Sequence, residues 1–413
     1  MKLHIPTISQ FASLLMLNIS NAVFQLLLIP ILIHNTATEK LGSYFLALSF
    51  SVLASILVNF GTSQTAVVEI RKANSEKEKK IILAETLSIR FIPLLLAIVV
   101  SCILPILTNN GIYYLLVLPI IIAECINPQF YLIATYKINL YSVFNLLIRI
   151  SLLVIIYLVR SQSLLIEITL FLMSMSILIL HLLYLPSTFF QKGVTEHIPS
   201  LDRLQTLLKT NILVTGNGLT VHLQQFMFLF ALPSFVSPLF LSAYGLIDKL
   251  ISSFRMLVNA YSAAVMPHAA GTHNEGFAAW KKLKAQQNKI MALLCIAAGA
   301  IMYLFPEQLL TVLFLGKNNN AVFFNEAAHL VKLISPVPLL IALNVLNVAE
   351  LILEKKFMAY FGAGVIVLLI SLLCIDALKL GLPAYYAGYY PVLIEGFCLC
   401  LYYLIVQKFR NAQ

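Results

Sequence analysis

Long apolar stretches separated by short polar segments dominate the sequence. Twelve of them are long enough to cross a bilayer as helices, because about 20 apolar residues span its hydrocarbon core. These stretches lie at about 9–33, 41–66, 83–107, 112–134, 141–159, 163–185, 206–230, 238–266, 286–305, 325–352, 357–378 and 384–406. The pattern therefore predicts an all-α integral membrane protein with twelve transmembrane helices.

The composition supports this fold class. Of the 413 residues, 60% are hydrophobic and 11% are charged, whereas soluble domains carry roughly 25% charged residues. No segment is long and polar enough to form a separate soluble domain, and the first apolar stretch lacks a small-residue cleavage site. We therefore expect that stretch to be a membrane span and not a removable signal peptide.

Positive charges lie mostly on one side of the predicted membrane. If the N-terminus is inside, the only cations of the outer loops are Lys40, Arg160, Lys317 and Lys379. Because loops rich in Lys and Arg stay in the cytoplasm, both termini are expected there. Five further cations fall within predicted spans: Arg90, Arg149, Lys249, Arg255 and Lys332.

The chain is expected to divide into two six-helix lobes. The polar connection Pro186–Arg203 separates the sixth span from the seventh, which predicts an N-terminal lobe over 1–192 and a C-terminal lobe over 193–413. Five residues of the first half recur 200 positions later: Tyr44, Leu46, Leu57, Val58 and Asn59. Since six spans return the chain to its starting side, the lobes would be pseudo-symmetric parallel repeats with the substrate site between them.

The eighth predicted span carries Asp248, Lys249 and Arg255 near its middle. Each central charge costs about 2.5–3.5 kcal/mol on insertion scales, so such residues normally face a wet interior. A spacing of three and four residues places six polar side chains on one helix face: Tyr244, Asp248, Ser252, Arg255, Asn259 and Ser262. We interpret this face as the lining of an aqueous cavity. The alternative is a buried ion-pair network that only fixes the orientation of the helix.

Other spans carry polar faces of the same kind. The first span has Asn18, Asn21 and Gln25 on one face, and the fifth has Arg149 on the face of Ser142 and Asn145. The seventh span has a polar stripe of five residues: Asn211, Thr215, Gly218, His222 and Gln225. Polar faces on equivalent helices of both lobes predict a wet central cavity. For Arg90, a cavity role and simple anchoring at the membrane surface remain open.

Acidic residues within spans are candidates for ion coupling. Glu124, Asp248 and Glu395 lie near the middle of their spans, where a carboxylate can take up and release a proton. The alternative is that each pairs with a neighbouring cation or hydroxyl. Cations outnumber these acids, so the cavity is expected to hold an anion, and Arg suits phosphate because its planar fork can contact two oxygens.

Several kinds of chemistry find no support in the sequence. There is no GxxxxGK[ST] loop, no CxxC pair and no HExxH motif, so we expect neither ATP-driven transport nor metal catalysis, and no cofactor. The HxxxxD spacing of His197–Asp202 stands in a short loop, and the six cysteines lie in apolar segments where packing is their expected role. The positive net charge follows membrane topology, so nucleic acid is not expected as a partner.

Five stretches of the sequence carry a resemblance to a known family: EKLGSYFLALSF (Glu39–Phe50), LVNFGTSQTAVVEIRK (Leu57–Lys72), NLLIR (Asn145–Arg149), LSAYGLIDKLISSFRMLVNAYSAAVMP (Leu241–Pro267) and LISPVPLLIALNVLNVAELIL (Leu333–Leu353). They resemble bacterial O-antigen and capsule polysaccharide flippases of the Wzx type, which belong to the multidrug/oligosaccharidyl-lipid/polysaccharide exporter (MOP) superfamily. The similarity extends over essentially the whole chain, although its motifs are degenerate.

The resemblance implies two six-helix bundles that form a V and work by alternating access around a cationic cavity. The substrate would be an undecaprenyl-pyrophosphate-linked oligosaccharide, moved to the periplasmic leaflet of the bacterial inner membrane. Membrane lipids, a proton or sodium ion and the glycan polymerase machinery would be further partners. Arg149 and Arg255 stand where cavity cations are expected, whereas His268 departs from the basic residue that relatives often have after Pro267.

Two other functions remain as alternatives. A small-molecule or ion antiporter of the same superfamily would share the fold, and an excess of deep acids over cations would favour it. A membrane glycan polymerase is an enzyme and usually carries a large outer loop. The longest outer loop here, about Phe305–Asn325, is short, so we expect a transporter and not an enzyme.

Overall fold

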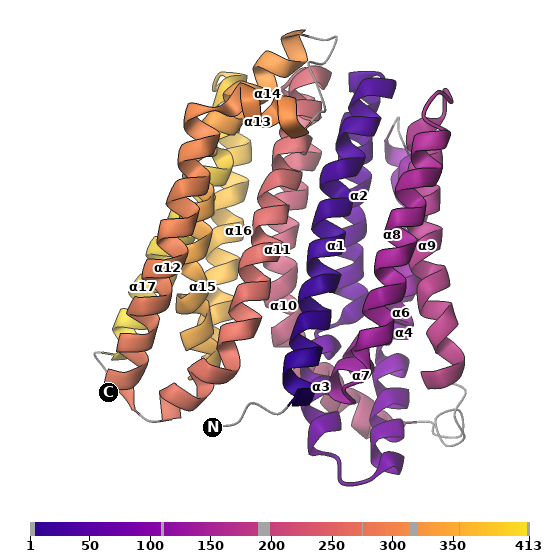
Figure 1. Cartoon of the computed structure of the whole chain (residues 1–413), viewed down its shortest axis with the longest axis vertical. Helices are drawn as coiled ribbons and strands as arrows, with labels where there is room; N and C mark the ends of the chain where they lie inside the picture. The colour runs from indigo at the N-terminus through magenta and orange to yellow at the C-terminus, as the bar shows by residue number, and fades with distance from the viewer. Residues whose placement is uncertain are drawn as a thin grey trace. The chain divides into compact units, whose positions relative to one another are not determined.

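The computed structural model of the chain describes residues 5–108, 111–188, 199–274, 276–313, 321–354 and 356–410. All regular secondary structure in these ranges is helical (Figure 1). The helices group into two compact units. Unit 1 consists of Met1–Phe24 and Ser43–Phe226, and unit 2 consists of Gln25–Gly42 and Met227–Gln413.

The helices of unit 1 are long spans interrupted by short broken segments. They are α1 (Ile5–Asn35) as far as Phe24, α2 (Thr38–Asn59) from Ser43, α3 (Thr62–Lys72), α4 (Glu76–Leu107), α5 (Ile112–Leu116), α6 (Leu118–Cys125), α7 (Gln129–Ala134), α8 (Ile138–Leu158), α9 (Leu165–Thr188) and α10 (Leu201–Ala231) as far as Phe226.

Unit 2 is built around α15, against which α11, α12, α16 and α17 pack; Figure 1 shows α12, α15, α16 and α17 side by side. Its elements are α1 from Gln25, α2 as far as Gly42, α10 from Met227, η1 (Leu232–Ser234), α11 (Pro238–Asn274), α12 (Phe277–Leu304), α13 (Pro306–Leu313), α14 (Ala321–Leu333), α15 (Val337–Leu353), α16 (Phe357–Lys379), η2 (Ala384–Tyr389) and α17 (Tyr390–Arg410). The predicted lobe boundary between residues 192 and 193 lies outside the described residues, so the division into lobes at that point stays a prediction.

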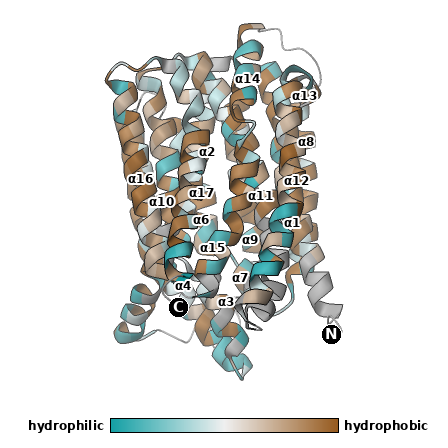
Figure 2. Cartoon of the chain, turned by 90° about the vertical axis from the view of Figure 1, so that its left-hand side faces the viewer, coloured by the Kyte–Doolittle hydropathy of each residue, from teal (hydrophilic) through white to brown (hydrophobic). Residues whose placement is uncertain are grey.

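The prediction of an all-helical membrane protein is confirmed. Within the described residues, nine helices are long and apolar enough to cross a membrane, or ten if α14 and α15, which meet at a bend of 41°, form one span. In Figure 2, α16 is hydrophobic along most of its length, whereas hydrophilic residues gather at the turn from α3 to α4. The number twelve stays a prediction, because α10 and α11 contain side chains outside the described set.

Two predicted spans of unit 1 are broken. The second span, predicted over 41–66, stops at α2 and resumes as α3, because Phe60 and Gly61 have positive φ angles of 50° and 67° that end the first helix. The fourth, predicted over 112–134, is divided into α5, α6 and α7, with Pro128 at the last break. Broken spans expose backbone groups inside a membrane protein, where ligand sites commonly form.

The polar run RKANSEKEKK, residues 71–80, forms the corner between α3 and α4. α3 ends at Lys72 and α4 begins at Glu76. Ser75 caps α4 by accepting a 3.1 Å hydrogen bond from the backbone N–H of Glu78, whose carboxylate in turn accepts from the N–H of Asn74 at 2.7 Å. This reciprocal arrangement satisfies exposed donors at the start of the helix.

Two glycines of unit 2 allow a direct test of its packing. A Cβ atom on Gly299 of α12 would stand 2.5 Å from the backbone oxygen of Ser335, whereas a Cβ on Gly362 of α16 would meet nothing within 4 Å. We expect Gly299→Ala to lower the free energy of unfolding by about 1–3 kcal/mol through overpacking. Gly362→Ala should raise it by up to about 1 kcal/mol, because alanine favours the helix.

The measurement is the midpoint of thermal unfolding of each purified variant in detergent. Equal shifts of the two variants in the same direction would contradict this packing.

Candidate functional site

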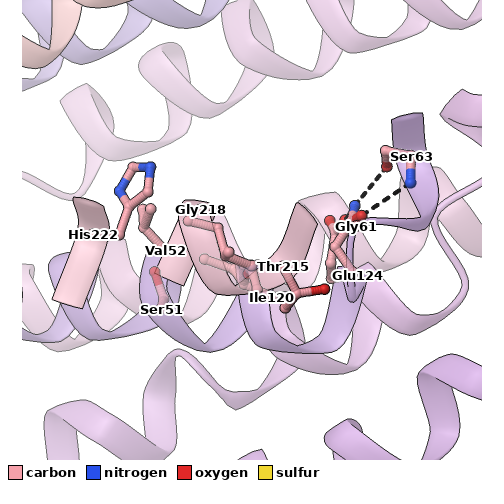
Figure 3. Close-up of a pocket in the computed structure, with 12 residues that line it drawn as sticks. Ser51, Val52, Gly61, Ser63, Ile120, Glu124, Thr215, Gly218 and His222 are labelled. Carbon is pink, nitrogen blue, oxygen red and sulfur yellow. Dashed lines mark hydrogen bonds between the residues drawn. The ribbon is translucent and has the colours of Figure 1, made fainter. Parts of the chain in front are cut away.

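A cavity of about 480 Å³ lies within unit 1, between α2, the break before α3, α6 and α10 (Figure 3). Its polar lining residues are Ser51, Ser55, Asn59, Ser63, Glu124, Thr215 and His222. Gly218 also lines it, and a Cβ there would stand 3.3 Å from Cγ2 of Ile56, so this glycine lets α10 approach α2 closely. Three residues of the polar stripe predicted for the seventh span, Thr215, Gly218 and His222, therefore face one cavity.

Glu124 lies at one end of this cavity and is held by two amides. The side-chain amide of Asn59 donates to Oε1 of Glu124 and to Oγ of Ser63, both at 2.6 Å, and that of Asn127 donates to Oε2 of Glu124 at 3.0 Å. His222 lies at the opposite end of the cavity (Figure 3). The lining thus has a carboxylate, Glu124, at one end and an imidazole, His222, at the other. The hydrogen-bond donors to Glu124 are neutral amides.

Arg90 is wholly buried, with none of its surface exposed. It donates to Oγ1 of Thr62 at 2.8 Å and to Oγ of Ser63 at 3.4 Å, and its Nη1 reaches the backbone oxygens of Glu124 and Asn127 at 3.1 Å. Its guanidinium also lies over the ring of Phe130, 4.7 Å from the ring centroid. Arg90 does not line the cavity, and it orients the residues that do.

Arg149 joins the predicted polar faces of the first and fifth spans. Its Nε donates to Oδ1 of Asn21 at 3.0 Å, and Asn145 donates to the same oxygen at 3.2 Å. The guanidinium lies 4.8 Å from the ring centroid of Phe24, which favours a cation electrostatically. Its Nη1 is buried and has no hydrogen-bond partner among the described residues. Arg149 therefore offers an unused donor group next to a polar face.

In unit 2, the charges of the eighth predicted span are paired. Arg255 of α11 forms an ion pair with Glu395 of α17, and Lys249 lies 3.4 Å from Oδ2 of Asp248. The side chains of Arg255 and Glu395 are 24% and 11% exposed, so this pair is shielded but can still be reached by solvent. Arg255 on the polar face and Lys249 beside it each have a carboxylate partner, which agrees with the ion-pair alternative for this part of the helix.

The remaining predicted residues are less connected. Asn18 donates to the backbone oxygen of Leu14 in its own helix at 3.0 Å, and Gln25 has a buried Oε1 atom without a partner among the described residues. Gln225 is half-buried in α10. The side chain of Asn259 lies outside the described residues.

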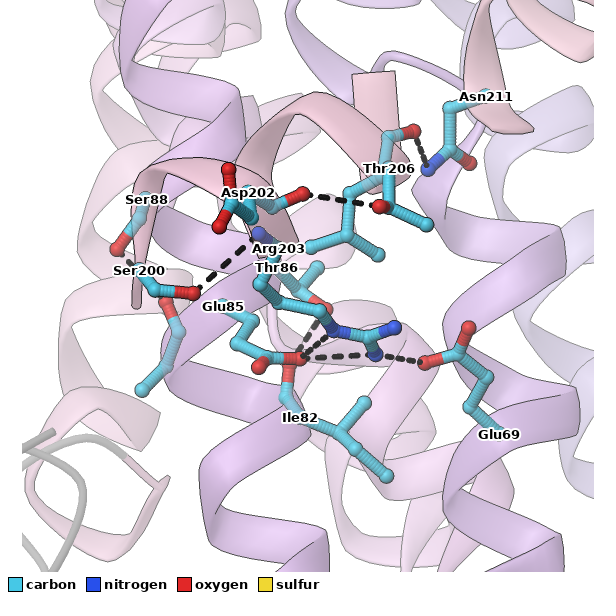
Figure 4. Close-up of polar contacts among 12 residues, drawn as sticks. Glu69, Ile82, Glu85, Thr86, Ser88, Ser200, Asp202, Arg203, Thr206 and Asn211 are labelled. Atoms are coloured by element: carbon cyan, nitrogen blue, oxygen red, sulfur yellow. Dashed lines mark hydrogen bonds and ion pairs between the residues drawn. The ribbon is translucent and has the colours of Figure 1, made fainter. Parts of the chain in front are cut away.

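Two charge clusters were not anticipated from the sequence. In unit 1, Arg203 at the start of α10 contacts Glu85 of α4 and Glu69 of α3, at 3.0 Å each (Figure 4). In unit 2, Glu350 binds both Lys284 and Arg410 at 2.7 Å. As basic residues near span ends, Arg203, Lys284 and Arg410 indicate which side of the membrane a loop lies on. Their positions in the sequence do not indicate which carboxylates they contact. Within the described residues, no group of three or more His, Cys, Asp or Glu side chains could hold a metal ion.

No protein-family model matches the chain, and no curated protein matches it by sequence. Several solved structures do match. An inward-facing multidrug resistance MATE family transporter of the MOP superfamily has a TM-score of 0.72 at 10% identity, with 98% of this chain and 99% of that chain covered. The lipid II flippase MurJ in an inward closed conformation has a TM-score of 0.71 at 12% identity, with coverage of 97% and 87%.

A third structure is a MOP superfamily transporter from Pyrococcus furiosus Vc1, described as having a binding pocket of reverse polarity that suggests a different function. Its TM-score is 0.61 at 12% identity, and 98% of this chain and 94% of that chain are covered. At such identities the likeness concerns the fold alone. The chain has the fold of the MOP superfamily transporters over nearly its whole length.

Arg90 provides a test of how the cavity of unit 1 is built. Arg90→Leu should lower the free energy of unfolding by about 3 kcal/mol or more, because it leaves several buried acceptors without a donor. The control is Arg71→Leu. Arg71 is exposed and lies over the ring of Tyr136 at 5.3 Å, a contact worth only about 0.5–1 kcal/mol.

Denaturation of both variants in detergent micelles compares the two losses. An Arg90→Leu protein as stable as Arg71→Leu would show that the buried hydrogen bonds of Arg90 do not support unit 1.

Proposed function

We propose that the chain is a flippase that moves undecaprenyl-pyrophosphate-linked oligosaccharide units across the bacterial inner membrane by alternating access. The observation that carries the proposal is Arg149. Within the described residues this cation has no carboxylate partner, and its buried Nη1 makes no hydrogen bond. A cation kept inside a membrane protein without a counter-ion is suited to an anionic ligand.

The surroundings of Arg149 fit a glycosylated phosphate. Asn21 and Asn145 contribute amide groups beside the guanidinium, and amides can donate to and accept from sugar hydroxyls. An arginine fork can bind two phosphate oxygens at once, with stronger hydrogen bonds than a neutral donor provides. The likeness in fold to a protein described as a lipid II flippase also supports a lipid-linked substrate.

In the mechanism we propose, the pyrophosphate enters from the cytoplasmic side and the polyprenyl tail stays in lipid. Arg149, Lys249 and Arg255 replace water around the phosphates, while Asn18, Asn21, Gln25, His222, Gln225 and Asn259 contact the sugars. The ion pair of Arg255 with Glu395 provides a way to couple substrate binding to a proton. Protonation of Glu395 removes its charge, and Arg255 then becomes available to the phosphate. Asp248 and Glu124 are the other candidates for ion coupling.

A small-molecule or ion antiporter is the second candidate. The specific observation in its favour is that Lys249 and Arg255 are both paired with carboxylates, so this face of unit 2 does not require an anionic ligand. The fold matches the multidrug MATE transporter, at a TM-score of 0.72, as well as it matches the lipid II flippase, at 0.71.

The deciding experiment uses a bacterial strain that lacks this gene and any functional paralogue. Surface glycan and the internal pool of lipid-linked repeat units are measured with and without the wild-type copy. Loss of surface glycan with complete units trapped inside, rescued by the wild type, is the expected result. Normal surface glycan in the deletion strain would contradict the proposed substrate and move the antiporter to first place.

Arg149→Ala should lower export in this strain at least about tenfold, because charge-assisted hydrogen bonds are worth about 1.5–3 kcal/mol. Arg149→Lys should keep part of the export, since a point charge still attracts phosphate but lacks the planar fork. Arg160→Ala is the control, because Arg160 lies just beyond α8 and, among the described residues, its guanidinium contacts only the neighbouring Tyr157. Export is compared at equal amounts of protein in the membrane. Normal export by Arg149→Ala would remove Arg149 from the path.

Arg255 and Glu395 allow a separate test of coupling. Arg255→Ala should abolish export and Arg255→Lys should retain part of it. Glu395→Gln should keep export but make it insensitive to a protonophore, because the amide has no charge to hold Arg255 and no proton to exchange. The measurement is the internal pool of lipid-linked units before and after the proton gradient is collapsed. A Glu395→Gln protein with the same sensitivity as the wild type would exclude Glu395 as the coupling group.

A further inference from the structure

A second cavity, of about 450 Å³, lies wholly within unit 2. α12 and α17 both pack against α15, so α15 forms the floor of a groove between them. The groove lies where α12 begins and α17 ends. Its polar lining residues are Lys281, Lys284, Asn288, Asn347, Tyr403 and Arg410. We call this cavity the α12–α17 groove.

The α12–α17 groove carries an excess of positive charge. Glu350 is 1% exposed, and its two oxygens accept from Nε and Nη2 of Arg410 and from Nζ of Lys284, at 2.7 Å each. One carboxylate therefore serves two largely buried cations. Lys281 adds a third positive charge at the exposed side of the groove and forms no ion pair among the described residues. Glu354 also acts electrostatically on Lys284, so two carboxylates stand near three cations, and the remaining positive charge attracts an anion.

Two polar groups of the groove have capacity left for a ligand. The ammonium of Lys284 has three N–H donors, and it uses two of them on Asn347 and Glu350, at 2.7 Å each. Asn288 lines the groove with a buried Oδ1 atom that has no partner among the described residues. A phosphate ester with a hydroxyl group would meet both, the phosphate at the lysine and the hydroxyl at the amide.

The groove also has an apolar lining. Ala285, Leu343, Leu399 and Cys400 contribute to it, and Cys400 and Tyr403 of α17 are exposed. Both α12 and α17 are candidate membrane spans. A soluble anion has no use for this surface, whereas acyl chains cover it favourably.

We propose that the α12–α17 groove binds the phosphate headgroup of an anionic phospholipid, with Lys281, Lys284 and Arg410 around the phosphate and the acyl chains along α12 and α17. Phosphatidylglycerol has the required chemistry, because it combines one phosphate charge with free hydroxyls. None of the lining residues of the groove has a role in the proposed substrate path, so its test does not depend on export.

The experiment is native mass spectrometry of the full-length protein, released from detergent that contains equal amounts of phosphatidylglycerol and phosphatidylcholine. Because one Lys or Arg near an anionic headgroup contributes about 1 kcal/mol, each cation is expected to favour the anionic lipid about fivefold. The wild type should therefore retain phosphatidylglycerol at least about fivefold over phosphatidylcholine. Equal retention of the two lipids would overturn the proposal.

Two neighbouring lysines supply a matched pair of variants. Lys281→Glu reverses a charge that lines the groove, whereas Lys282→Glu makes the same change at the next residue, which is also exposed and does not line it. The first should lose the preference for phosphatidylglycerol and the second should keep it. Asn288→Asp, which places a negative charge inside the groove, should act like Lys281→Glu. Equal behaviour of the two lysine variants would overturn the assignment of the site.

A final arm separates a lipid from a soluble phosphate ester. The thermal unfolding midpoint of the wild type is measured with phosphatidylglycerol or with millimolar glycerol phosphate. The lipid alone should raise the midpoint, and Lys281→Glu should remove the increase. Equal stabilisation by glycerol phosphate would overturn the assignment to a lipid.

Discussion

The interior of a bilayer offers no water to polar groups, so each break in a membrane helix must find its hydrogen-bond partners in the protein. In unit 1, one side chain serves two such breaks. Arg90 donates to Thr62 and Ser63, which follow the break after α2, and to the backbone oxygens of Glu124 and Asn127, which flank the break before α7. Asn59, Ser63 and Glu124 line the cavity that these breaks create. The shape of the cavity thus depends on a buried cation that does not face it.

Charge is arranged differently in the two units. In unit 1, Arg149 is surrounded by amides and an aromatic ring, and Glu124 is held by Asn59 and Asn127. In unit 2, Lys249 of α11 pairs with Asp248, and Arg255 of the same helix pairs with Glu395. An unpaired cation gains most when an anion arrives, whereas a paired cation must first lose its partner. This difference gives the two units separate tasks in the proposed cycle, attraction of the substrate in one and its coupling to an ion in the other.

The sequence predicts what depends on a single helix. Spacing placed Asn21 on one polar face and Arg149 on another, and the structure joins those faces through a direct hydrogen bond. The sequence could not show that Arg255 pairs with Glu395. The two residues are 140 positions apart, and periodicity contains no information about contacts between helices. Nor could the sequence locate the break at Phe60 and Gly61, since no proline marks it and a single glycine is common inside membrane helices. Glu350 was missed because its partners, Lys284 and Arg410, looked like ordinary charges at the membrane surface.

The α12–α17 groove also has an optical consequence. The chain contains a single tryptophan, Trp280, which is 1% exposed and precedes Lys284 by one helical turn at the start of α12. Fluorescence excited selectively at the indole ring therefore comes from beside the α12–α17 groove of unit 2. Unit 1 contributes none of it. Changes in the colour or lifetime of this emission follow the surroundings of one known side chain, without any label. The fluorescence of Trp280 can thus report lipid binding and helix movement in unit 2, independently of ligand binding at Arg149 in unit 1.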